Sequence, residues 1–370
     1  MTQKNQAKTY ERIKLILNIS ETIIYIGIIL ILIFGGWSAY LRDLAASCVE
    51  NVYFQLLIFI GILGFVLSVF SVPLSFISGF WMEHYYNLSN QTFWAWLWEK
   101  IKAFLVGIIL SVPLLLLFYY LLSNYPETWW IWMAAALFFF SVLIGRIAPV
   151  VIFPLFYKFD KLADEEIVER MEKLAKEGNF KLDGVYRFNM SKTTKKANAA
   201  FTGMGKSKRI ILGDTLLDEF SLDEIESVFA HEVGHYVHKH LMINVAIGTI
   251  NSFLSLFIAH LVYNYLLKQI GFTGQADLAA LPLLFLILTI ISLIMSPLTN
   301  MLSRSHERQA DKYALKKSSN AKAFLTAMKK LAKINLADES PHPVIEFLFH
   351  SHPSISKRIQ FAKSLGVQEE

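Results

Sequence analysis

Two histidines and a glutamate in the middle of the chain have the spacing of a metal site. They are His231, Glu232 and His235, within the stretch Phe229–Tyr236. Residues four apart on a helix lie on one face, so both imidazoles can bind one tetrahedral metal ion with the carboxylate beside it. Because so short a pattern also arises by chance, the surrounding sequence must decide whether it forms a site.

A third ligand is needed, because a catalytic zinc site usually takes three protein ligands and leaves the fourth position to water. Glu307, in the stretch Ser303–Asp311 after the last apolar segment, is the candidate. Asp311 lies one helical turn further on, where a carboxylate can accept the outer N–H of a zinc-bound imidazole. The predicted ligands of one zinc ion per chain are therefore His231, His235 and Glu307, with Asp311 behind them.

These residue types predict zinc-dependent hydrolysis of a peptide bond. Zinc lowers the pKa of its bound water toward about 7, and Glu232 would take the proton as the hydroxide attacks the carbonyl. The single cysteine, Cys48, excludes a cysteine-rich zinc site. The alternative is that the two histidines and Glu307 are ordinary solvated side chains.

The remaining histidines are weaker candidates. His238 and His240 are expected to be solvated or interfacial residues near the next apolar segment. His352 could stabilise a developing oxyanion, or it could cap a helix. A fourth ligand, for example His352 or His350, would instead close a structural zinc site in a non-catalytic membrane chamber or transporter. Glu232 argues against a structural site, which has no use for a base.

The composition indicates a polytopic membrane protein. Of 370 residues, 54% are hydrophobic and only 18% are charged. The mean hydropathy of +0.43 lies outside the range of soluble globular proteins. Six apolar segments can each cross a bilayer core of about 30 Å. They are Thr22–Leu41, Asn51–Met82, Ala103–Pro126, Trp129–Tyr157, Leu241–Leu267 and Leu278–Ser303.

The basic residues predict the orientation of these spans. With a cytoplasmic amino terminus, only Arg42 and Lys268 of the 35 basic residues lie in non-cytoplasmic loops, apart from Arg146 within a span. The net charge of +5 therefore reflects topology, and no nucleic-acid partner is expected. The predicted location is the prokaryotic inner membrane, with the site facing the cytoplasm, or the ER membrane if the source is eukaryotic.

The expected fold is mainly α: a bundle of about six spans with a small α/β zincin-like domain on the cytoplasmic side. Residues 1–157 would hold transmembrane helices 1–4, and residues 158–240 the α/β part with the motif helix. Residues 241–303 would form a transmembrane hairpin, and residues 304–370 a helical tail with the third ligand. The capping box Ser221–Glu224 starts the motif helix, so helical spacing is predicted independently of the motif.

Charge and hydropathy patterns also predict the elements of the α/β part. We expect an amphipathic helix over Asp164–Glu177 and strands over Gly184–Met190 and Lys208–Leu212. The polar segment between the two strands, with Asn198 and Gly203, is typical of a turn or an irregular edge.

With these residues placed, the chain resembles the zinc-dependent integral-membrane CAAX prenyl proteases of type 1, which are related to the HtpX-type membrane proteases. The resemblance runs from about Phe76 to Arg358 and includes the motif helix. Its other matching stretches are Phe153–Phe159, Asn198–Gly203, Lys208–Leu217, Ser303–Asp311 and His352-Pro353.

The resemblance implies the zinc ligands and the general base named above. It further implies that Asn198 and Ala199 lie on an edge that holds the substrate backbone as an added strand. His352 would assist at the oxyanion, and Arg358 would hold its helix or the substrate terminus. Family members enclose an intramembrane chamber, which would explain polar residues such as His260 within the spans; such residues could equally pair with one another between helices.

The implied partners are membrane lipid and a peptide or protein substrate, most simply one prenylated at its carboxyl terminus. The alternative of the HtpX type is quality control of membrane proteins. Two features depart from the family pattern. Eukaryotic members commonly have seven spans, whereas six are counted here, with the short segment Gly36–Glu50 where another crossing would be expected. Ala200 also replaces the aromatic residue often found after Asn-Ala.

Overall fold

A computed structural model describes residues 3–202 and 209–367 of the chain. Within them, six helical segments are long and apolar enough to cross a membrane, which confirms the predicted mainly helical membrane fold. These segments are Gln3–Phe34, Val52–Tyr85, Phe93–Asn124, Trp129–Leu155, His240–Ile270 and Leu278–Lys317. They contain helices α1 (Gln3–Phe34), α3 (Val52–Phe76), α4 (Met82–Tyr85), α5 (Phe93–Asn124), α6 (Trp129–Ile147), α10 (His240–Ile270) and α11 (Leu281–Lys317).

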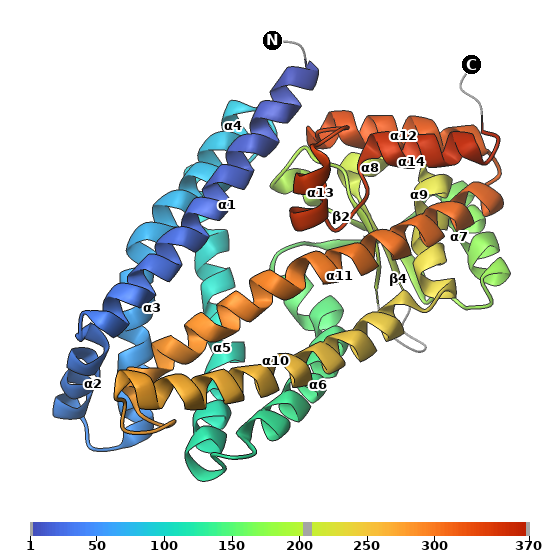
Figure 1. Ribbon diagram of the computed structural model, residues 1–370. Helices are drawn as coiled ribbons and strands as arrows, with labels where there is room; N and C mark the ends of the chain where they lie inside the picture. The colour runs from blue at the N-terminus through green and yellow to red at the C-terminus, as the bar shows by residue number, and fades with distance from the viewer. Residues whose placement is uncertain (1–2, 203–208, 368–370) are drawn as a thin grey trace.

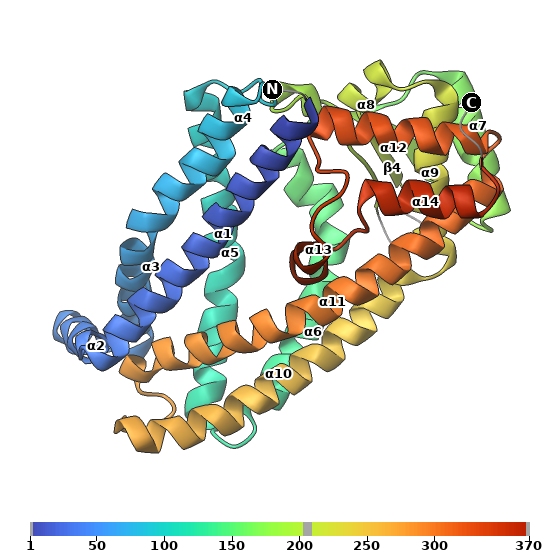
Figure 2. The same ribbon diagram turned by 45° about the horizontal axis from the view of Figure 1, so that its top comes forward.

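The long helices form a closed series around the bundle axis (Figures 1 and 2). Neighbours contact one another in the order α3, α1, α11, α10, α6 and α5. Aromatic pairs join α3 to α5 at both ends. Tyr53 and Tyr119 have ring centroids 6.0 Å apart at one end, and Phe76 lies 5.6 Å from Trp96 at the other. The intramembrane chamber that the family resemblance implies stays a prediction.

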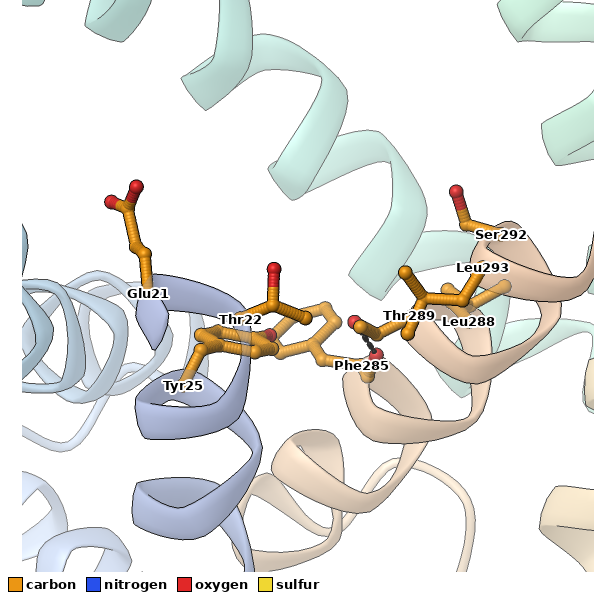
Figure 3. Close-up of a pocket in the computed structure, with 8 residues that line it drawn as sticks. All are labelled: Glu21, Thr22, Tyr25, Phe285, Leu288, Thr289, Ser292 and Leu293. Atoms are coloured by element: carbon orange, nitrogen blue, oxygen red, sulfur yellow. Dashed lines mark hydrogen bonds between the residues drawn. The ribbon is translucent and has the colours of Figure 1, made fainter. Parts of the chain in front are cut away.

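A pocket of about 630 Å³ lies between α1 and α11, two of the candidate membrane spans. Figure 3 shows the side chains of Glu21, Thr22 and Ser292 pointing into the same open space. A carboxylate is costly in lipid and is tolerated where it faces a polar interior or a water-filled cavity. These polar side chains favour a water-filled space between the two helices at this position.

The first span differs from the prediction at both ends. Helix α1 starts at Gln3, because the charged amino-terminal segment continues the helix beyond the apolar run. It ends at Phe34 and not at Leu41, because Gly36 adopts a left-handed φ of 75°. The following helix α2 (Trp37–Cys48) has 12 residues and a length of about 18 Å, too short for a crossing.

The α/β unit lies at one end of the bundle (Figures 1 and 2). Its sheet has the order β1-β2-β4-β3, in which only β2 and β4 run parallel, with Val185 opposite Ile210. The strands are β1 (Phe159–Lys161), β2 (Gly184–Phe188), β3 (Ala199–Thr202) and β4 (Arg209–Gly213). The predicted helix and two strands correspond to α7 (Glu165–Glu177), β2 and β4, whereas β1 and β3 were not predicted. Gly203 and Lys208 lie outside the described residues.

The remaining elements are short or belong to the carboxyl-terminal part. The α-helices are α8 (Asp214–Glu219), α9 (Leu222–Val237), α12 (Ala321–Asn335), α13 (Pro343–Phe349) and α14 (Ile355–Ser364). Helices of other types are η1 (Ile77–Trp81), η2 (Ala148–Ile152), η3 (Phe153–Leu155), η4 (Met190–Lys192) and η5 (Leu278–Ala280). Buried apolar residues of α7, α9 and α12 share one core with β2 and β4.

Two local features fix the motif helix α9. Its capping box is formed as predicted: the Ser221 backbone N–H donates to Glu224 at 2.8 Å, and the Glu224 N–H donates to the Ser221 hydroxyl at 3.4 Å. Gly234 lies against α11, where an added Cβ would be 2.8 Å from the Cα of Ala310. The predicted domain boundary at residue 303 falls inside the continuous α11, and the four-part division stays a prediction.

Candidate metal centre

Three side chains from α9 and α11 converge as the sequence predicts. His231, His235 and Glu307 each offer a ligand atom, and these atoms all lie within 4.8 Å of one another. The two imidazole Nε2 atoms are 3.2 Å apart, and they lie 3.3 Å from Glu307 Oε2 and Oε1. Oε2 is buried and has no hydrogen-bond partner within the described residues. Two nitrogens and an orphaned carboxylate oxygen aimed at one point fit a divalent metal ion.

Asp311 supports His231 from behind. The Nδ1–H of His231 donates to Asp311 Oδ1 at 2.8 Å, and Asp311 is fully buried. Arg358 in turn donates through Nε and Nη2 to the two Asp311 oxygens, at 2.9 and 2.6 Å. Burial lowers the pKa of His231, but the carboxylates of Asp311 and Glu307, which accept hydrogen bonds from the protonated ring, outweigh it and raise that pKa to about 9. The two carboxylates thus orient the His231 ring and favour a positive charge at the site, either on the protonated ring or on a bound metal ion.

His235 has a different partner, which sequence reasoning missed. His240 is buried, and its Nδ1 lies 2.9 Å from Nδ1 of His235. His240 is therefore not solvated, although it does lie at the start of the next span, as expected. Lys239, with a left-handed φ of 56°, turns the chain between α9 and α10 and so brings His240 back toward the site. His238 is exposed, as expected.

Glu232 and His352 lie at the edge of this cluster. Glu232 is half-buried on α9 between the two histidines. His352 places Nε2 at 3.3 Å from Glu307 Oε1 with 62% of its side chain exposed. It does not cap a helix, because the residue at the start of α14 is Ser354. Arg304 of α11 donates to the backbone carbonyl of His350 at 2.5 Å and so anchors the loop that carries His352.

Asn198 and Ala199 lie where an added strand could pair. Ala199 begins β3, one of the two outer strands of the sheet, and β3 contacts the motif helix α9. Asn198 is exposed, and its carbonyl accepts the Gly213 N–H at 3.0 Å. Arg358, by contrast, is buried against Asp311 and so contacts the site from behind. Roles of these residues in substrate binding stay predictions.

Comparison with known proteins identifies the family. The model of peptidase family M48 matches residues 161–365, and a model described as CAAX prenyl protease N-terminal, five membrane helices, matches residues 2–158. The chain belongs to peptidase family M48. It is therefore a multi-pass membrane metallopeptidase, as the motif and the apolar segments predict. In the part matched by the five-helix model, the structure has four long spans and the short α2.

Known proteins are similar to this chain in sequence and in structure along most of its length. An uncharacterized metalloprotease of Bacillus subtilis is 31% identical over 94% of this chain and 83% of that protein. CAAX prenyl protease 1 of Saccharomyces cerevisiae is 31% identical over 82% of this chain and 71% of its own length. The crystal structure of S. mikatae Ste24p superposes with a TM-score of 0.87 at 27% identity, covering 97% of this chain and 89% of that one.

Proposed function

We propose that the protein is a zinc endopeptidase that cleaves near the carboxyl terminus of prenylated peptides of the CAAX type. His231, His235 and Glu307 would hold the zinc, and Glu232 would be the general base. One observation carries the proposal: the metal-binding group of the described residues has three members, and neither His350 nor His352 joins it. Three protein ligands leave a position for water, which favours a catalytic over a structural site.

The side chains around this group suit each step of peptide hydrolysis. Bound zinc would supply a water of lowered pKa at the open position. Glu232 would accept a proton from the attacking water and pass it to the leaving amine. His352, exposed beside Glu307, donates a hydrogen bond to the oxygen that becomes negative in the transition state. Asp311 holds His231 in the tautomer that leaves Nε2 free for the metal.

The substrate backbone would bind along β3. An extended peptide adds to an exposed sheet edge through main-chain hydrogen bonds, and β3 presents such an edge next to α9. Asn198 and Ala199 lie at the start of this edge. A peptide in this position would pass beside the motif helix and bring one carbonyl to the metal.

The membrane part supports a lipid-linked substrate. CAAX prenyl protease 1 of Saccharomyces cerevisiae and its human homologue are similar to most of this chain, the latter with 29% identity over 91% of it. The pocket between α1 and α11 combines apolar side chains such as Phe285 and Leu288 with polar ones. Exposed Trp81, Trp94 and Trp98 are typical of a membrane interface, which we place on the cytoplasmic side.

A pair of matched peptides tests the proposal. Purified protein in detergent is incubated with one CAAX peptide, farnesylated or unmodified, with and without a zinc chelator, and the products are identified by mass spectrometry. We expect cleavage that the chelator abolishes and that is faster for the farnesylated peptide. Equal cleavage of both peptides would contradict the prenyl preference and favour quality control of membrane proteins. Cleavage that survives complete removal of the metal would overturn the mechanism.

A further inference from the structure

The two histidines of the metal centre have different outer partners. Nε2 of each ring faces the common point, so Nδ1 of each ring faces away from it. For His231 the outer partner is the carboxylate of Asp311. For His235 it is another imidazole, that of His240, with 2.9 Å between the two Nδ1 atoms. Because a neutral imidazole has one donor nitrogen and one acceptor nitrogen, only one of these two Nδ1 atoms can carry the shared proton.

The hydrogen-bond partners of His235 and His240 determine which nitrogen of each ring is protonated. If His235 binds a metal through Nε2, its proton is on Nδ1, which must donate to Nδ1 of His240. His240 then carries its own proton on Nε2, which lies 3.2 Å from Oε1 of Gln309. An amide oxygen only accepts, so Gln309 holds His240 in the tautomer that can accept from His235. Every donor in the chain finds an acceptor.

Packing keeps His240 in place for this task. Only 2% of the residue is exposed. Its ring stacks on that of His306, with centroids 4.1 Å apart and planes 12° apart. His306 directly precedes Glu307 on α11, so the helix that delivers the third ligand also supports the partner of His235.

We propose that His240 is a positioning residue that fixes the tautomer and the ring orientation of His235, with Gln309 as its anchor. The inference rests on the proposed zinc ligands and adds a determinant of metal affinity. Without an acceptor at this position, His235 loses the partner that keeps its proton on Nδ1, and the ring is free to rotate. Loss of such an outer partner typically lowers metal affinity 10- to 100-fold.

Two substitutions separate positioning from mere packing. His240→Leu fills the space without an acceptor, whereas His240→Asn is smaller but keeps an amide oxygen near the place of Nδ1. His238→Leu is the control for packing, because the exposed His238 ring also stacks on His240, with centroids 5.6 Å apart, but is not the partner of His235 Nδ1. Gln309→Met removes the anchor of His240 at an exposed position. Zinc affinity of the full-length protein in detergent is measured by competition with a chromophoric chelator, and thermal unfolding is followed beside it.

We expect His240→Leu to weaken zinc binding 10- to 100-fold, His240→Asn to recover most of the affinity, and His238→Leu to match the wild type. Gln309→Met should show a smaller loss, which keeps the test decisive if His240→Leu does not fold. Equal losses in the Leu and Asn variants, or wild-type affinity in Gln309→Met, would overturn the positioning role. A wild-type protein that binds no zinc would overturn the proposed ligand set as well. The readout needs no peptide substrate, so it does not depend on the proposed specificity.

Discussion

Gly234→Ala tests how closely the two helices of the metal centre must approach each other. Gly234 lies on α9 directly before His235 and faces α11 at Ala310. Glu307 is one turn before Ala310 on the same helix. Any separation of the helices at this crossing therefore moves the carboxylate away from the two imidazoles.

The size of the effect follows from the contact distances. An alanine Cβ would be 2.8 Å from the Cα and 3.1 Å from the carbonyl oxygen of Ala310, both backbone atoms. Carbon atoms in contact are about 3.5–4.0 Å apart, so the helices must separate by roughly 0.7–1.2 Å. Alanine gains about 1 kcal/mol of helix propensity over glycine. Overpacking costs about 1–3 kcal/mol, so we expect a net loss of stability of up to about 2 kcal/mol.

The metal should respond more strongly than stability. Bonds between a metal ion and its ligands tolerate changes in length of only about ±0.2 Å. A helix separation of roughly 0.7–1.2 Å would therefore weaken the bond between zinc and Glu307. We expect zinc affinity to fall at least about tenfold, a change of roughly 1.4 kcal/mol.

A glycine in open space provides the control. Gly248 on α10 has no atom within 4 Å of an added Cβ, so Gly248→Ala should leave zinc affinity unchanged and stability unchanged or slightly raised. Both variants are compared by chelator competition and by thermal unfolding. Wild-type zinc affinity and unfolding temperature in Gly234→Ala would refute the close approach.

Three further predictions concern the capping box of α9, the pH dependence of zinc binding and the loop that carries His352. Ser221→Ala should lower the free energy of unfolding by about 1 kcal/mol, because it removes the acceptor of the capping box; unchanged denaturant midpoints would contradict this. Acid should weaken zinc binding, because proton and metal compete for His231, whose pKa is raised to about 9. Between pH 9 and pH 7 the apparent affinity should fall about tenfold per pH unit, and a flat chelator titration would refute it. Arg304→Gln should free the loop that carries His352. It should lower kcat with zinc content unchanged, in steady-state kinetics of peptide cleavage, whereas a wild-type kcat would exclude this anchoring role.

The spans and the metal ligands could be predicted because their signals are local. The length of a charge-free segment can be read from the sequence. His231 and His235 lie on one helix, so their spacing alone predicts that both face the same side. Glu307 is distant in sequence, but the orientation of the spans placed its helix on the same side of the membrane as the motif. The structure brings these three side chains together as expected.

The features that sequence reasoning missed depend on backbone turns and on tertiary contacts. The left-handed turns at Gly36 and Lys239 end one helix early and return His240 to the site. The strand β3 has four residues, too few to show an alternating pattern. The role of Gly234 appears only when α11 is placed against it. None of these is encoded in residue spacing alone.

Equal zinc loading of the wild type and Glu232→Gln, followed by cleavage of one peptide, tests the central claim most directly. The substitution keeps the shape of the side chain and removes only its capacity to accept the proton. We predict one zinc ion per chain in both proteins and a cleavage rate at least about 100-fold lower in the variant, the contribution of a general base. A zinc-loaded variant that cleaves at the wild-type rate would contradict the account.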